Sequence, residues 1–131
     1  MALPNGAGGY QLGDGNVGEA NLTVQGAPTA LTAAATLTAA QLSNGLFTYT
    51  GAAVNLTLPT VADLEAGIAS AQKVNAAFEF GVINIGGTNA ATLVVGTGWT
   101  IVGAAAVAAA TSARFLARKT GDGTWTLYRV A

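Results

Sequence analysis

The stretch Val54-Asn55-Leu56-Thr57-Leu58-Pro59 has the cleanest alternation of apolar and polar side chains in the chain. A period of two is typical of a β-strand with one buried face, and the proline predicts where that strand ends. The stretch Phe78-Glu79-Phe80-Gly81-Val82 repeats the alternation and turns Glu79 away from the face that the two phenylalanines share. We therefore expect β-structure to dominate the fold.

Further short strands are predicted on both sides of these two, because Gly, Pro, Ser or Thr separates each apolar run from the next. The first strand is expected over 54–58 and the second over 77–85, and the other ranges are 22–25, 30–37, 46–50, 91–95, 99–102, 106–110, 113–118 and 124–130, with a hairpin tip at 119–124. The spacing predicts an all-β fold, an antiparallel jelly roll or β-sandwich of about eight strands with one short helix. Its buried positions should include Leu56, Leu58, Phe78, Phe80, Val82, Phe115 and Leu127.

The one helix is expected over residues 61–71. Thr60 and Asp63 have the spacing of a capping box, and Leu64 and Ile68 lie four residues apart on one helical face. A single helical turn is also expected between Thr38 and Gly45, with these two residues as its caps.

Composition excludes several classes of chemistry. The 131 residues are enough for one domain, and 29 Ala, 18 Gly and 17 Thr make up nearly half of them. Charged residues are only 8% of the chain, against about 25% in an ordinary domain. The chain has no Cys and no His, which excludes disulfides, thiolate or imidazole metal sites and histidine-based catalysis. We expect no cofactor and no enzymatic activity.

The charges are few and unevenly distributed. A net charge of −1 makes nucleic acid or an anionic membrane an unfavourable partner. Residues 1–72 carry four acidic and no basic groups, whereas residues 73–131 carry five basic and two acidic groups. This asymmetry is either chance or a sign that copies dock with acidic half near basic half. The uncharged run 80–113 is interrupted by Asn and Gly, so it does not predict a membrane-spanning helix.

Residues 1–20 are expected to form an extended N-terminal arm, followed by one domain over residues 21–131. Six of the first twenty residues are Gly, and their spacing matches no phosphate-binding loop. Such a segment buries too little apolar surface to order by itself. Its apolar side chains nevertheless suit an extended chain laid in a groove of a neighbouring subunit or of another partner protein, and the candidate interface residues are Leu3, Pro4, Tyr10 and Leu12.

Two groups of side chains are candidate sites. Asp63 and Glu65 are best interpreted as residues of the first helical turn, where carboxylates favour the helix dipole. A cluster of Trp99, Trp125, Tyr128 and Arg129 is either core and rim or an aromatic platform for a sugar or nucleic acid.

Several motifs carry a resemblance to a known class of protein. They are Thr38–Leu42, Leu56–Leu64, Phe78–Asn84, Gly98–Thr100 and Gly123–Val130. The stretch from Thr36 to Val130 resembles small structural proteins of tailed bacteriophages, best of all capsid decoration (cement) proteins. The resemblance implies a small jelly-roll-like β domain that binds the outside of an icosahedral head, as a trimer or dimer, and braces the shell. It implies the major capsid protein and further copies of itself as partners, with a homotrimer favoured over a dimer. It also implies a place on the outer surface of the virion after synthesis in the host cytoplasm.

Two other functions remain open on the sequence. A receptor- or carbohydrate-binding phage fibre or spike module predicts few copies per particle and an exposed aromatic cleft near Trp99 or Trp125. A small hydrolase predicts paired carboxylates facing one cleft. The Met1 start and the short chain favour a stand-alone decoration protein.

Overall fold

The computed structural model describes residues 22–68 and 73–131, so the proposed arm and its Leu3, Pro4, Tyr10 and Leu12 lie outside the described residues. The strands are β1 (Thr29–Leu31), β2 (Ala35–Thr36), β3 (Leu46–Tyr49), β4 (Val54–Thr57), β5 (Ala77–Asn84), β6 (Ala91–Val94), β7 (Trp99–Val102), β8 (Ala106–Val107), β9 (Ser112–Gly121) and β10 (Thr124–Arg129). The helices are α1 (Ala39–Asn44) and α2 (Val61–Gly67).

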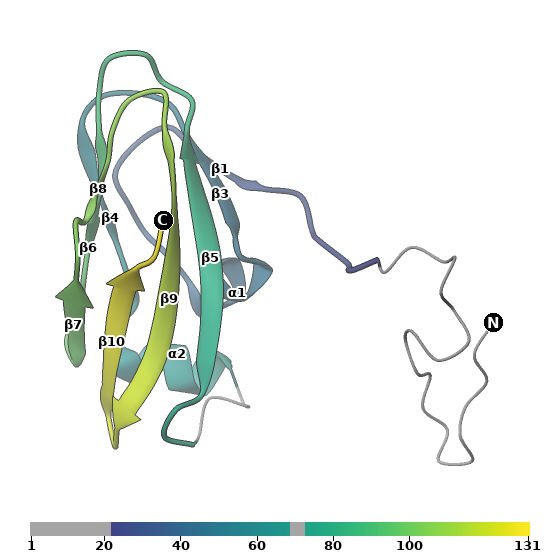
Figure 1. The fold of residues 1–131 in the computed structure, drawn as a ribbon, viewed down its shortest axis with the longest axis vertical. Helices are drawn as coiled ribbons and strands as arrows, with labels where there is room; N and C mark the ends of the chain where they lie inside the picture. Colours follow the sequence, from purple (N-terminus) through teal and green to yellow (C-terminus); the bar gives the residue numbers. More distant parts are fainter. Residues whose placement is uncertain (1–21, 69–72) are drawn as a thin grey trace.

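The strands form two sheets that lie face to face (Figure 1). A six-stranded sheet has the order β1-β3-β5-β9-β10-β7, and a four-stranded sheet has the order β2-β4-β6-β8. In Figure 1 the broad strands β5, β9 and β10 lie in front, and β4, β6 and β8 lie behind them. Helix α2 lies across one end of the pair of sheets.

The expectation of an all-β, antiparallel jelly roll or sandwich is wrong. The fold is mixed α/β, because both sheets combine parallel and antiparallel strands and two helices are present in the described residues. In the six-stranded sheet β1, β3 and β5 run parallel, as do β10 and β7, while β9 is antiparallel to β5 and β10. In the other sheet β2, β4 and β6 run parallel and β8 is antiparallel.

Strand directions follow from the path of the chain. From β1 to β6 successive strands alternate between the two sheets, so neighbours within a sheet are separated by a strand of the other sheet. Each such circuit returns the chain in its original direction, which makes the neighbours parallel. The β9–β10 pair is a hairpin with an antiparallel register from Thr124↔Gly121 to Arg129↔Phe115. Alternation of side chains specifies the buried face of a strand but not its direction, and for this reason the antiparallel arrangement predicted from the sequence is wrong.

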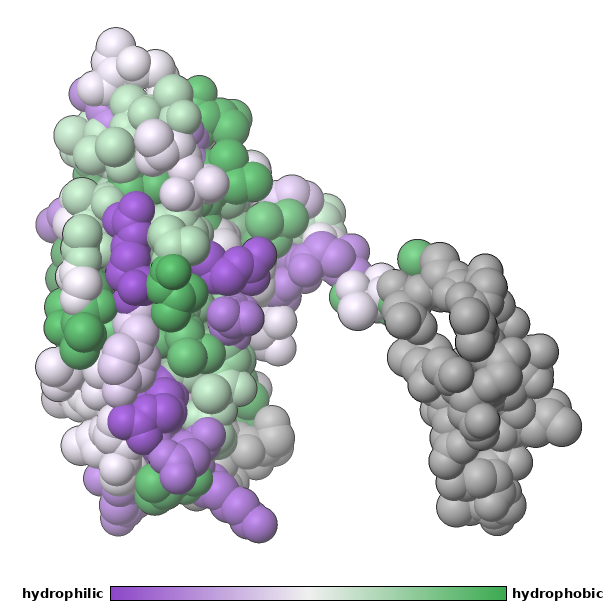
Figure 2. All heavy atoms as spheres, viewed as in Figure 1, coloured by the Kyte–Doolittle hydropathy of each residue, from purple (hydrophilic) through white to green (hydrophobic). Residues whose placement is uncertain are grey.

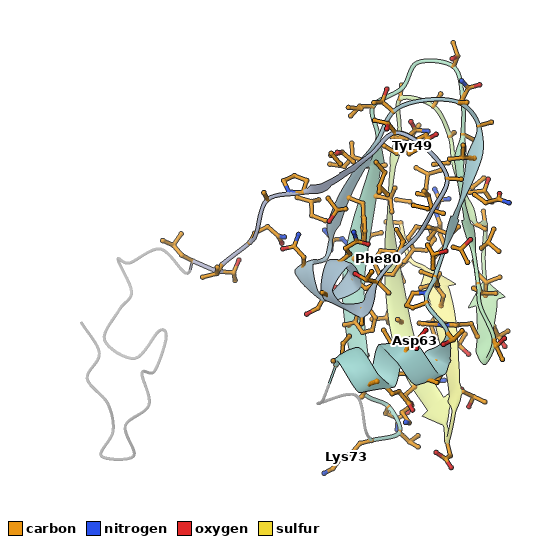
Figure 3. The ribbon with its side chains drawn as sticks, turned by 180° about the vertical axis from the view of Figure 1, so that it is seen from behind. Tyr49, Asp63, Lys73 and Phe80 are labelled. Carbon is orange, nitrogen blue, oxygen red and sulfur yellow. The ribbon has the colours of Figure 1, made fainter. Side chains whose placement is uncertain are left out.

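The core between the sheets confirms most of the predicted buried positions. Six of the seven are buried, whereas Phe78 is only partly buried and packs against the rim of the core. Phe80, labelled in Figure 3, lies at the centre, with ring centroids 5.9 Å from Phe47 and 5.5 Å from Phe115. One contiguous cluster thus joins both sheets and both helices.

Both helices begin at the predicted caps. The Thr38 side chain accepts a hydrogen bond from the Gln41 backbone N–H, and the Gln41 side-chain oxygen accepts one from the Thr38 backbone N–H, which completes a capping box. Gly45 ends α1 with a φ of 82°. The Thr60 side chain likewise accepts from the Asp63 N–H at the start of α2. Helix α2 ends at Gly67, four residues before the predicted end.

Three strand predictions are corrected. The expected strand over residues 30–37 is divided into β1 and β2, which lie in different sheets. Residues 22–25 form no strand, and Leu22 and Val24 are 82% and 103% exposed, because no neighbouring strand pairs with this segment. Strand β9 extends to Gly121, so Lys119 lies within a strand and the turn is confined to Asp122 and Gly123. Among the described residues, neither helix has the length and apolar character needed to cross a membrane.

Candidate functional site

Charged side chains are segregated onto one part of the described structure. They lie on α2, β5, β9 and β10 and in the turns at residues 73 and 122. Strands β2, β4, β6 and β8, which make up the whole four-stranded sheet, carry none. Burial of a charge is costly unless it is paired, so a surface without charges is the easiest one to cover with another protein.

The outer face of the four-stranded sheet is therefore neutral. Leu56 and Leu93 are paired in register and buried, so the alternate positions point outward. We call this set the neutral face: Thr36, Asn55, Thr57, Thr92, Val94 and Ala106. A shallow depression of about 450 Å³ lies at its edge, lined in part by Ala53, Asn55 and Thr92.

The outer face of the six-stranded sheet has a different character. Figure 2 shows it over β5, β9 and β10, where apolar groups in green are interspersed with polar groups in purple. Glu79, Leu116 and Tyr128 are neighbours across three strands, and Arg118 stands beside them. The Arg118 guanidinium donates hydrogen bonds to Asn75 Oδ1 at 2.8 Å and to the Tyr128 hydroxyl at 2.9 Å.

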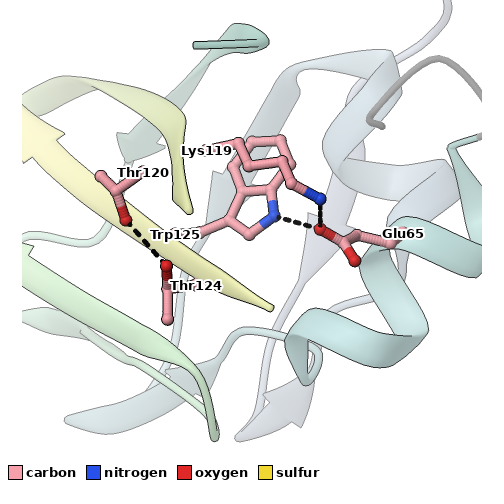
Figure 4. A network of polar contacts seen from close by, with 5 residues as sticks. All are labelled: Glu65, Lys119, Thr120, Thr124 and Trp125. Atoms are coloured by element: carbon pink, nitrogen blue, oxygen red, sulfur yellow. Dashed lines mark hydrogen bonds and ion pairs between the residues drawn. The ribbon is translucent and has the colours of Figure 1, made fainter. Parts of the chain in front are cut away.

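A buried polar network ties α2 to the β9–β10 hairpin (Figure 4). The ammonium of Lys119, a residue only 4% exposed, forms an ion pair with the carboxylate of Glu65. The indole N–H of Trp125 donates to the same carboxylate oxygen at 3.0 Å. These two donors, Lys119 first, hold the pKa of Glu65 below its ordinary value. The network keeps the Glu65 carboxylate ionised and fixed in place, which suits a structural role in holding α2 against the hairpin.

The sequence predicts both Asp63 and Glu65 in the first turn of the helix, and the structure confirms this for Asp63 alone. Asp63 lies in the first turn of α2, where a negative charge favours the helix dipole. Glu65 lies beyond that turn and binds the hairpin instead. Burial of Lys119 was missed, although it shares the period-two register of Phe115 and Ala117, and that spacing is the signal that could have found it.

The proposed aromatic platform is divided between the core and two surfaces. Trp99 and Trp125 are 8% and 1% exposed, with ring centroids 5.8 Å apart, so their faces are covered. Tyr128 points outward beside Arg118, whereas the Arg129 guanidinium lies over the Phe115 ring and donates to the carbonyl of Ala106. No aromatic cleft is formed by Trp99 or Trp125.

A second buried polar residue was also missed by the sequence. Asn84, at the end of β5, is 1% exposed, and its side-chain N–H groups donate to the carbonyls of Asn89 and Val107. Its side-chain oxygen accepts from the Gly86 backbone N–H at 3.1 Å. Asn84 therefore satisfies backbone groups of the β5–β6 loop and of β8, which is a structural role.

Carboxylates do not converge in the described parts of the chain. Asp63 and Glu65 line two different depressions, of about 550 and 490 Å³. Glu79 is exposed on the opposite face of its strand from Phe80, as predicted. Across residues 22–68 and 73–131 no three acidic, His or Cys residues cluster in a way that could hold a metal ion.

Comparison with protein-family models, with curated protein sequences and with solved structures finds no match to this chain.

Proposed function

We propose that this chain is a structural virion protein without enzymatic activity, a capsid decoration (cement) protein that binds the outer surface of an icosahedral phage head and stabilises it. Its partners in this proposal are the major capsid protein and two further copies of itself in a homotrimer. The resemblance of residues 36–130 to small phage structural proteins supports this function.

The observation that carries the proposal is the neutral face. A four-stranded sheet with no charged residue presents Thr, Asn, Val and Ala side chains to solvent. Such side chains are short, so little conformational entropy is lost when a partner covers them. A broad surface of this kind suits a permanent contact with a protein shell better than it suits recognition of a small ligand.

The alternative function, a receptor- or carbohydrate-binding fibre module, requires an accessible stacking surface. Burial of Trp99 and Trp125 removes the two side chains on which the sequence placed that surface. The same observation leaves the cement proposal unaffected, because a flat interface needs no aromatic cleft.

Copy number per particle tests the proposal. Purified particles of the phage that encodes the chain are separated on a stained gel, and the band of this protein is compared with that of the major capsid protein. We expect a number of copies of the order of the capsid protein itself, and heads stripped of the protein should burst at lower temperature. A few copies per particle, or none on the head, would contradict a decoration function and favour the fibre module.

A further inference from the structure

The outer face of the six-stranded sheet carries exposed apolar side chains that no other described residue covers. Ile83, Val102 and Val130 are 38%, 50% and 51% exposed. Strand register places all three on this face, since their alternate neighbours point into the core. Half-buried Leu46, Leu116 and Tyr128 lie on the same face. The result is an apolar band that crosses the sheet from β3 to β7.

A depression interrupts this band beside the side chain of Arg114. It holds about 290 Å³ and is lined by Leu46, Gly81, Ile83, Ser112, Arg114 and Ala131. Gly81 leaves the space open, because a Cβ there would meet no atom closer than 3.8 Å. The Arg114 guanidinium has no ion-pair or hydrogen-bond partner within the described residues. An apolar depression with a free guanidinium at its rim suits an apolar chain that carries a carboxylate.

Residues 1–21 have that chemistry. They contain Asp14 and Glu19 and no Lys or Arg, together with the apolar residues Leu3, Pro4, Tyr10 and Leu12. The face has the opposite balance, with Arg114 and Arg118 against the single acid Glu79. The segment also has the length required, since 21 extended residues reach about 70 Å, several times the radius of gyration of about 13 Å expected for such a domain.

The path of the chain directs this segment to another copy. Gln25 Nε2 donates to the Asn44 carbonyl, and Asn44 Nδ2 donates to the Ala27 carbonyl, which fixes residues 25–27 against the end of α1. Before that point the chain runs away from the sheets (Figure 1), and Leu22 and Val24 contact almost nothing. A chain that leaves its own domain in this way is placed to reach a neighbour.

We propose that residues 1–21 of one copy bind across the outer face of the six-stranded sheet of the next copy, with Asp14 and Glu19 beside Arg114 and Arg118 and with apolar side chains over the Gly81 depression. The contact is heterologous, and in the proposed homotrimer three copies close it into a ring. This inference rests on the self-assembly in the proposed function. It assigns the arm to a neighbouring subunit, which leaves the neutral face free for the shell.

The inference is tested with variants of the full-length chain in which charges of the arm and of the sheet face are reversed. Sedimentation velocity at micromolar concentration measures how strongly each variant forms the trimer. Arg114→Glu should raise the dissociation constant of the trimer about tenfold or more, because a paired charge becomes a repulsive one. Lys73→Glu is the matched control, since it makes the same reversal of charge in the turn beside α2, where Figure 3 labels Lys73. Combining Arg114→Glu with Asp14→Lys and Glu19→Lys should restore most of the lost association.

A second variant does not depend on charge. Gly81→Ala should weaken the trimer by filling the depression, whereas Gly87→Ala, which adds a methyl group in open space on a loop, should not. Circular dichroism melting confirms that each variant is folded. If Arg114→Glu and Gly81→Ala assemble as their controls do, the inference is wrong while the proposed function stands. A wild-type chain that is monomeric contradicts the proposed trimer as well, and copy number on particles then tests the decoration function separately.

Discussion

At the scale of single residues, the Glu65 network makes a contribution to stability that can be tested. Glu65→Ala leaves the ammonium of Lys119, a residue 4% exposed, without its counter-ion. We expect it to lower the free energy of unfolding by about 2–4 kcal/mol, because an unpaired buried charge costs more than a lost contact. Lys119→Met should cost about half as much, since Met fills the same space and Glu65, whose side chain is 20% exposed, keeps both water and the Trp125 N–H. Urea unfolding of both variants measures the difference, and a larger loss for Lys119→Met would contradict this account.

The same carboxylate makes stability depend on pH. Hydrogen bonds from Lys119 and Trp125 lower the pKa of folded Glu65 below its ordinary value of 4.5. A group with a depressed pKa in the folded state stabilises the protein fully above 4.5, and this contribution is lost as the pH falls through the folded pKa. The difference in unfolding free energy between wild type and Glu65→Gln should therefore be constant near neutral pH and shrink below about pH 4.5. A difference that stays unchanged down to pH 3 would show that Glu65 is not held by these donors.

At the scale of elements, Phe80 on β5 tests whether the predicted buried face of the strand contributes most to the free energy of unfolding. Its ring packs between Phe47 and Phe115 and is fully buried. Phe80→Ala should cost about 3–5 kcal/mol, the range for a large aromatic side chain removed from a packed core. Phe78→Ala is the matched control on the same face, and it should cost less because Phe78 is only partly buried. Equal losses in denaturant unfolding would indicate that the core is not centred on Phe80.

Some features of these elements are set by neighbouring residues and could be predicted from the sequence, whereas others are set by contacts between distant residues and could not. Caps are local, so Thr38, Gly45 and Thr60 could be placed from the sequence alone. Buried faces are also local, because alternation reports them directly. Strand direction depends on which sheet the chain enters next, and no short pattern in residues 29–94 carries that information. The unpaired segment 22–25 shows the same limit, since its alternation is real but no partner strand lies beside it.

The candidate surfaces could be predicted only in part. The absence of charges was visible in the composition, yet the neutral face depends on four strands from distant parts of the chain meeting in one sheet. The register of β9 could have indicated burial of Lys119, but its ion-pair partner, Glu65, lies 54 residues away in the sequence. Pairs of this kind are set by the three-dimensional path and leave no mark at fixed spacing.

At the scale of the whole molecule, the distribution of charge predicts self-association. With the charged residues of the described structure gathered on α2, β5, β9, β10 and their turns, a monomer exposes an uncharged sheet and an apolar band to water. We expect a monodisperse trimer at micromolar concentration in analytical ultracentrifugation. Raising the salt concentration should weaken it modestly, because it screens the charged half of the contacts and not the apolar half. A monodisperse monomer, with no clusters of the protein on heads, would contradict the trimer.

Deletion of residues 2–16 separates the folded domain from its assembly. The described core is formed by side chains from Leu37 onward, so we expect thermal unfolding to change little. Attachment to heads should weaken about a hundredfold or more, because a trimer holds the shell at three points and a released monomer at one. Ordering the arm costs about 1–2 kcal/mol per fixed residue, so only its well-packed residues can repay the cost, and Leu3→Ser with Tyr10→Ser should reproduce much of the deletion. Arg114→Glu should weaken attachment in parallel, since it acts on the same contact from the other side. Unchanged decoration of heads by the truncated chain would show that the arm contributes to neither contact.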